Sequence, residues 1–150
     1  MRRLSVLLVS AVMALTLIAL AVATGAAAQQ PAQQQKQFYS TLYEGKKAFY
    51  AGDGTSKAAA IKNGRAICEA KDTKCKGLAW VYNGYIAIAE GKAPQGGFGY
   101  AWGIGHTQKE AEAQSIKACK APPPFTGCKV FDSFRTSAYD PNKTTKGGPL

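Results

Sequence analysis

The chain has 150 residues, a net charge of +10 and four cysteines. This length suffices for one folded domain behind an N-terminal targeting segment, and it excludes two large domains. Most of the basic residues are lysines, which lack the planar fork that arginine offers to nucleic-acid bases. The composition therefore argues against sequence-specific nucleic-acid binding. It favours a solvated basic surface, or attraction to anionic surfaces as the alternative.

Residues 1–28 have the order of a secretory signal peptide. Arg2 and Arg3 precede an apolar run, and small residues lead to Ala28. The run approaches the roughly 20 residues that cross a bilayer, so a retained anchor is the alternative. The small residues and the polar segment after them favour cleavage after Ala28. We therefore expect a secreted or periplasmic chain with a flexible leader (29–36) and no membrane span after cleavage.

The next segments predict strands that flank two helices. Short runs rich in aromatic and β-branched residues, bounded by Gly, Pro or Asn, are typical of strands. They cover residues 37–44, 46–52, 76–83, 84–91, 98–105 and 128–135. Asn83 and Gly84 both tolerate positive φ, which predicts a hairpin turn between two of these runs. Residues 137–150 are polar, with proline and paired glycines, and predict a flexible tail.

Two segments of the chain share one plan. GDGTSKAAAIKNGRAIC (52–68) and GIGHTQKEAEAQSIKAC (103–119) each contain G-x-G-x-[ST], a helical stretch and a cysteine. Ser56 and Thr107 are predicted to cap the helices, and Thr107 forms a capping box with Glu110. A shift of 51 residues aligns the segments, which predicts two internal repeats, about 37–83 and 84–136.

Each predicted helix carries small residues at helical spacing. Ala60 and Gly64 in the first helix correspond to Ala111 and Ser115 in the second. Such a face lets a helix approach a sheet closely. Gly64→Leu is therefore expected to overpack the contact and to lower the free energy of unfolding by about 1–3 kcal/mol.

The fold class expected from these elements is α+β, in one domain of residues 37–136. We expect two tandem ββαβ units that form a mixed or antiparallel sheet with both helices on one face. Two separate small sheets are the alternative that the sequence leaves open.

The four cysteines predict disulfides, because an exported chain meets an oxidising compartment. The pairing Cys68–Cys75 and Cys119–Cys128 respects the repeat. Cys68–Cys119 with Cys75–Cys128 is the alternative. We expect no metal site, because the chain has no CxxC spacing and His106 is its only histidine.

The GIGHT segment (103–107) precedes a predicted helix and could form a phosphate-binding site. A dinucleotide fingerprint needs a third glycine where this chain has Gln108, so a cap and turn are favoured over an anion site. The alternative function is a secreted or periplasmic hydrolase, for which His106 is the catalytic candidate, together with Asp53 or a nearby hydroxyl. No cofactor is expected.

Aromatic residues and lysines suggest a binding surface instead of a catalytic site. Outward-facing aromatic rings beside lysines can hold sugars or stacked rings. We predict an exported binding or inhibitor-like module without catalysis, whose partner is an envelope or secreted protein or an anionic surface. The candidate binding residues are Trp80, Tyr100, Trp102, His106 and Thr107.

The second repeat carries a recognisable pattern. An Ala87-Ile88-Ala89 strand, a Trp102-Gly103 turn, Ala111-Glu112 in a helix, and the pair Cys119 and Cys128 resemble a secreted bacterial family called domain of unknown function 4189. The chain departs from the pattern at Ser115 and at the three prolines 122–124. The resemblance implies export, disulfides and a small α+β domain, and it implies no activity.

Overall fold

The computed structural model describes residues 36–150 and contains two helices and seven strands in that range. The predicted signal peptide (1–28) and all of the predicted leader except Lys36 lie outside the described residues. No helix within residues 36–150 is long and apolar enough to span a membrane. In chain order the elements are β1 (Tyr39–Glu44), β2 (Phe49–Gly54), α1 (Lys57–Lys71), β3 (Lys76–Tyr82), β4 (Tyr85–Lys92), β5 (Phe98–Gly105), α2 (Gln108–Cys119), β6 (Thr126–Arg135) and β7 (Lys146–Pro149). The α+β class is confirmed.

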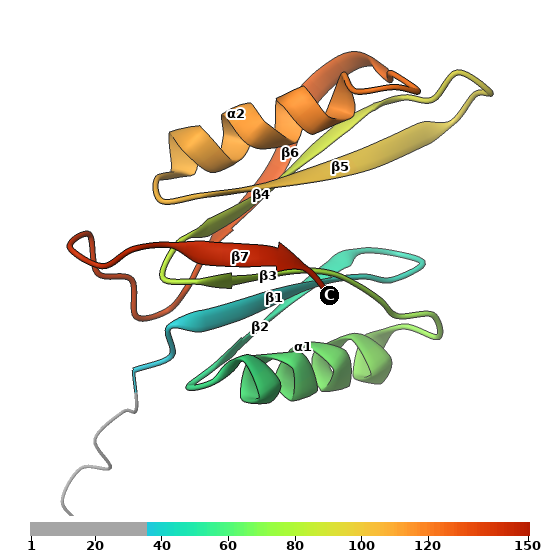
Figure 1. Cartoon of the computed structure of the whole chain (residues 1–150). Coiled ribbons are helices and arrows are strands. Elements are labelled where there is room, and N and C mark those ends of the chain that lie inside the picture. The colour runs from blue at the N-terminus through green and yellow to red at the C-terminus, as the bar shows by residue number, and fades with distance from the viewer. Residues whose placement is uncertain (1–35) are drawn as a thin grey trace, which may run out of the picture. The chain divides into compact units, whose positions relative to one another are not determined.

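The strands form two sheets, ordered β2-β1-β3-β7 and β5-β4-β6, and their pairings are antiparallel. Each half of the chain has the same order of strand, strand, helix and strand. In Figure 1 the sheets lie between the helices, with α1 on the outer side of the first sheet and α2 on that of the second. The antiparallel pairing is as expected, but the expected single sheet with both helices on one face is wrong, and the alternative of two sheets is correct.

The main core lies between the two sheets. Leu42, Val81, Ile86 and Ile88 are almost completely buried and form one apolar cluster, although they come from both sheets. Neighbouring residues in a strand point to opposite faces. Thr41 consequently points to the helix side, where its hydroxyl donates a hydrogen bond to the Ala60 carbonyl. Each sheet thus has a helix on one face and the other sheet on the opposite face, which explains why two sheets form.

Both helices begin at the predicted caps. The Ser56 hydroxyl accepts a hydrogen bond from the Ala59 N–H at the start of α1. At the start of α2, Thr107 and Glu110 form the predicted capping box. Each cap satisfies N–H groups that have no partner within the helix.

The paired glycines before the helices have a different role from the expected turn. Gly52 and Gly54 lie in β2, Gly103 and Gly105 lie in β5, and none of the four has positive φ. A Cβ atom on any of them would overlap the backbone of the adjacent helix. These glycines therefore permit close packing of strand and helix and are not needed for turn conformations.

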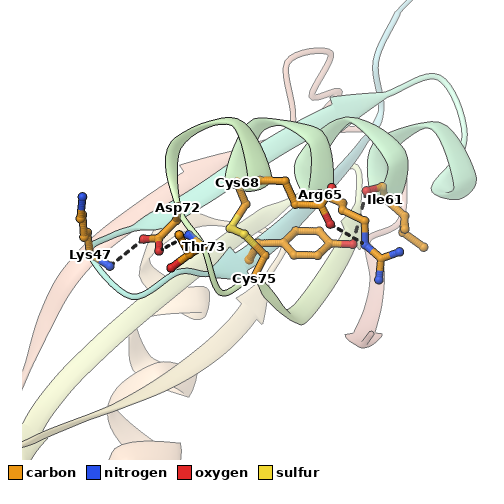
Figure 2. Close-up of a disulfide and its surroundings, with 9 residues drawn as sticks. Lys47, Ile61, Arg65, Cys68, Asp72, Thr73 and Cys75 are labelled. Carbon is orange, nitrogen blue, oxygen red and sulfur yellow. Dashed lines mark hydrogen bonds and ion pairs between the residues drawn. A yellow bond between two sulfur atoms is a disulfide. The ribbon is translucent and has the colours of Figure 1, made fainter.

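The predicted disulfide pairing is confirmed. Cys68 pairs with Cys75 and Cys119 with Cys128. The first bond joins the last turn of α1 to the residue before β3, beside the Asp72 carboxylate (Figure 2).

Asn83 has the expected positive φ, at 50°, but the predicted hairpin is wrong. The strands on either side, β3 and β4, belong to different sheets. At Asn83 the chain passes from the first sheet to the second, because β3 pairs with β1 and β7 while β4 pairs with β5 and β6.

The segment expected to be a flexible tail, 137–150, is largely held in place. Its end forms β7, the fourth strand of the first sheet. The buried Asn83 side chain donates to the carbonyls of Asp140 and Lys143 and accepts from the Asp140 N–H. These contacts join residues almost 60 positions apart, so no local sequence signal reports them.

Candidate functional site

The outer face of β3 presents an open row of aromatic rings. The helix α1 packs mainly over β2 and β1 and hardly reaches β3. Trp80 lies opposite Thr41 in the β1–β3 register, and Tyr82 lies opposite Tyr39. Because paired residues share a face, these side chains point to the same side as Thr41, which binds α1. The part of this face beyond α1 is available to solvent.

Four rings make up the row, and they contact one another in sequence. Tyr39 stacks on Trp80 with 6.3 Å between ring centroids and 26° between planes. Tyr39 also packs on Tyr82 at 5.0 Å, and Phe38 packs on Tyr82 at 5.9 Å. All four rings are partly exposed. The result is a continuous strip of aromatic surface.

Lysines surround the row. The Lys57 ammonium lies 4.2 Å from the Trp80 ring centroid, and that of Lys143 lies 4.1 Å from the Phe38 centroid. Lys146 is exposed and lies opposite Tyr82 in the β3–β7 register. We call these seven residues the aromatic–lysine surface. It comprises Phe38, Tyr39, Trp80, Tyr82, Lys57, Lys143 and Lys146. Rings supply flat apolar area and ammonium groups supply positive charge.

A hollow of about 630 Å³ adjoins this surface at Phe38. Residues 36–38 line one part of it and residues 137–141 line the other. The surface is therefore not flat throughout, because it runs into a depression beside the C-terminal segment.

His106 lies against the C-terminal segment. Its Nδ1 is 2.8 Å from the Thr145 hydroxyl, and its Nε2 is 3.1 Å from the Pro141 carbonyl oxygen and 3.2 Å from the Tyr139 hydroxyl. The Thr145 hydroxyl donates in turn to the Asn83 carbonyl, so Nδ1 is the donor toward Thr145. Both ring nitrogens thus contact groups of residues 139–145, and this contact holds the segment against the second sheet.

The second catalytic candidate, Asp53, makes its hydrogen bonds with residues other than His106. Its carboxylate accepts a hydrogen bond from the Ser137 hydroxyl, and its carbonyl accepts one from the Asn63 amide. Within residues 36–150, Asp53 and His106 share no hydrogen bond. The structure does not bring this pair together as a dyad.

The remaining candidate binding residues have separate surroundings. Trp102 is partly buried and packs against the core between the sheets. Tyr100 is 40% exposed and makes edge contacts with Phe49 and Phe131. Tyr100 and Trp102 both line a cavity of about 180 Å³ between the sheets. The Thr107 hydroxyl accepts a hydrogen bond from the Glu110 N–H as the cap of α2.

Sequence reasoning found only Trp80 among the seven residues of the aromatic–lysine surface. Alternation along the strands could have added Tyr39 and Tyr82. The sequence did not place Lys143 and Lys146 on this surface, because they belong to the segment interpreted as a flexible tail.

Comparison with curated proteins finds no match for the chain, and comparison with solved structures finds none either. A family model described as a domain of unknown function matches residues 38–134, from Phe38 in the aromatic row to Phe134 in β6. This span includes both helices and both disulfides. The C-terminal segment that carries β7 lies beyond it. Since the match covers well over half of the 150 residues, the chain belongs to the domain of unknown function family DUF4189.

Proposed function

We propose that the chain is a non-catalytic binding module that holds an acidic polysaccharide on the aromatic–lysine surface. The observation that carries this proposal is the row of four partly exposed rings with ammonium groups close to two of them. A sugar ring has an apolar face that can lie on an aromatic ring, and its carboxylate groups can pair with lysines.

The charge of the chain supports an anionic ligand. The sequence carries 19 Lys and Arg against 9 Asp and Glu, and positive surface charge attracts polyanions over a distance. The two disulfides favour an oxidising compartment, so we propose a secreted or periplasmic location. Acidic polysaccharides occur in such places, whereas nucleic acid is mainly intracellular.

Titration calorimetry with alginate, a polyuronate, tests the proposal, and dextran serves as the neutral comparison. We expect alginate to bind with an affinity that falls as salt is added, because exposed ion pairs are screened. Dextran is expected to bind far more weakly. The variant Trp80→Ala should weaken alginate binding roughly fivefold to tenfold, since a ring contact is worth about 1–1.5 kcal/mol.

A charge-matched control separates the surface from general attraction. The double variant Lys57→Ala with Lys143→Ala removes two charges from the aromatic–lysine surface. The double variant Lys109→Ala with Lys117→Ala removes two from α2. Only the first pair should weaken binding strongly. Equal losses would contradict a defined site, and equal affinity for a single-stranded DNA of similar charge would contradict polysaccharide as the ligand class.

Binding can also be followed at the proposed site itself. The chain has two tryptophans, so Trp102→Phe leaves Trp80 as its only one. In this background, alginate should change the Trp80 emission in proportion to the calorimetric saturation. A saturable calorimetric signal with unchanged Trp80 emission would place the ligand elsewhere.

A further inference from the structure

The outer edge of β3 is occupied by the short strand β7. Val81 pairs with Gly147 and Trp80 with Gly148, and Lys146 and Pro149 continue the ladder on either side. The N–H of Leu150 donates to the carbonyl of Leu78 at 3.2 Å. In Figure 1 β7 lies at the margin of the first sheet, on the side away from β2. A backbone ladder of this kind can in principle be made by any extended polypeptide.

The side chains of β7 contribute little to holding it. Gly147 and Gly148 have none, and Pro149 lacks an N–H for the ladder. Leu150, which follows the strand, is 40% exposed, and the rest of its side chain lies against Gly77. The four residues of β7 therefore depend mainly on a few backbone hydrogen bonds, each with a net value of about 1 kcal/mol.

The segment just before β7 is fixed much more firmly. The Thr145 hydroxyl donates to the Asn83 carbonyl at 2.6 Å and accepts from the His106 ring. Asn83 also binds the backbone of Asp140 and Lys143. A change that releases residues 146–150 can thus leave residues 139–145 in place.

The two glycines of β7 have different surroundings. A Cβ atom on Gly147 would lie 2.7 Å from the Ile104 side chain and 2.7 Å from the Trp80 carbonyl oxygen, so no side chain fits there. A Cβ atom on Gly148 would lie 3.7 Å from the Trp80 indole nitrogen, which is an ordinary contact and, chain neighbours aside, the one atom within 4 Å in the described part of the chain. The edge therefore requires glycine at the first position and accepts a side chain at the second, which would start beside the Trp80 ring.

We propose that the β3 edge is a docking site for an extended segment of a partner protein, and that β7 is its displaceable occupant. The preferred segment has glycine facing Ile104, followed by a large apolar or aromatic residue beside Trp80. Such a segment makes the same ladder as β7 and adds a side-chain contact that β7 lacks. The family match ends at residue 134, so the site belongs to the shared domain and the occupant lies outside it. This proposal does not depend on the polysaccharide proposal.

Variants of the full chain test the two positions. We expect Gly148→Trp to increase protection of the Leu150 N–H from hydrogen exchange by roughly tenfold, because the new ring packs on Trp80. We expect Gly147→Trp to abolish that protection, because the new side chain would collide with Ile104. Equal effects of the two substitutions would overturn the proposal.

Peptides test docking directly. We use fluorescein-labelled KTTKGGPL, the sequence of residues 143–150, and two versions that carry Gly148→Trp or Gly147→Trp. Added to the full chain with Gly147→Trp, whose own β7 is displaced, the Gly148→Trp peptide should bind at least tenfold more tightly than KTTKGGPL. The Gly147→Trp peptide should not bind. Indistinguishable affinities, or no binding to a folded chain, would overturn the proposal.

If the Gly147→Trp variant does not fold, the wild-type chain is used to test docking instead. An excess of the Gly148→Trp peptide should then lower protection of the chain's own Leu150 N–H while the amide protons of α1 and α2 stay protected. Unchanged protection at saturating peptide would overturn a displaceable β7. Dimers that form from the chain alone as its concentration rises would assign the edge to strand exchange between copies, and would overturn a foreign partner.

Discussion

Gly52 in β2 lies directly against Gly64 in α1, so close that a Cβ atom on Gly52 would overlap the Gly64 backbone. In the second half of the chain, Gly103 in β5 lies against the backbone at Ser115 in α2 in the same way. The obstacle in both places is backbone, which cannot rotate away as a side chain can. The small residues at these positions set the distance between each helix and its sheet.

We predict that Gly52→Ala and Gly103→Ala each lower the free energy of unfolding by about 1–3 kcal/mol, since one extra methyl group overpacks a close contact. Urea unfolding followed by circular dichroism measures the change. Gly148→Ala is the matched control, because a Cβ atom there meets only an ordinary contact. If all three variants lose the same stability, close packing is not the reason for the glycines in β2 and β5.

The helices, their caps and the disulfides follow from local sequence. Ser56 and Thr107 are cap residues next to helical patterns, and Cys68 and Cys119 recur at one place in two similar segments. These features depend on residues within one or two helical turns. That is why the sequence predicted them correctly.

The sheet arrangement depends on information that a strand pattern does not contain. Alternation shows that Trp102 and Gly103 point to opposite faces, but it does not say that a second sheet covers the Trp102 face. The pairing of β7 with β3 could not be predicted from the strand pattern either. Its sequence, KGGP, is poor in strand-forming residues, and contacts of residues 140–145 with Asn83 and His106 bring it to β3. The aromatic–lysine surface was predicted only in part, because Lys143 and Lys146 lie in that segment.

Removal of either disulfide is predicted to destabilise the chain. The loops closed by Cys68–Cys75 and Cys119–Cys128 span 7 and 9 residues of sequence separation. For loops of this size the chain-entropy relation gives about 2.5 kcal/mol each. Replacing both cysteines of one pair by serine should lower the free energy of unfolding by about that amount in urea titrations. Combining both pairs should lower it by roughly twice as much, and no loss in either double variant would contradict the prediction.

His106 is predicted to anchor the C-terminal segment. His106→Ala removes the hydrogen bonds that the ring makes with the Thr145 and Tyr139 hydroxyls and should lower the free energy of unfolding by about 1–2 kcal/mol. Hydrogen exchange should accelerate in residues 139–149 and stay unchanged in α1.

The same variant bears on the hydrolase hypothesis. A hydrolytic activity of the wild-type chain that disappears in His106→Ala, while exchange in residues 139–149 is unaltered, would contradict a purely anchoring role. Lys109→Ala, an exposed substitution on α2, controls for general effects of mutation near this end of the sheet.

Asp72 should make the stability of the chain depend on pH in the acid range. Burial acts to raise the pKa of its carboxyl, but the backbone N–H groups of Lys47, Thr73, Lys46 and Lys74 lower it and prevail, so the pKa lies below its ordinary value. Two of these bonds, from Lys47 and Thr73, are 2.8 Å long and are drawn beside the disulfide in Figure 2. Asp72 thus connects the end of α1 to the β1–β2 turn.

A carboxyl whose pKa is lower in the folded than in the unfolded chain stabilises the fold fully above the unfolded value, which is about 3.9. That contribution is lost as the pH falls through the folded pKa. Asp72→Asn should therefore be less stable than wild type in urea titrations at pH 6, and the difference should shrink steadily as the pH falls below about 4. Asp132→Asn, an exposed substitution on β6, should show little difference at either pH. A gap between wild type and Asp72→Asn that is as large at pH 3 as at pH 6 would mean that Asp72 acts through its shape and not through its charge.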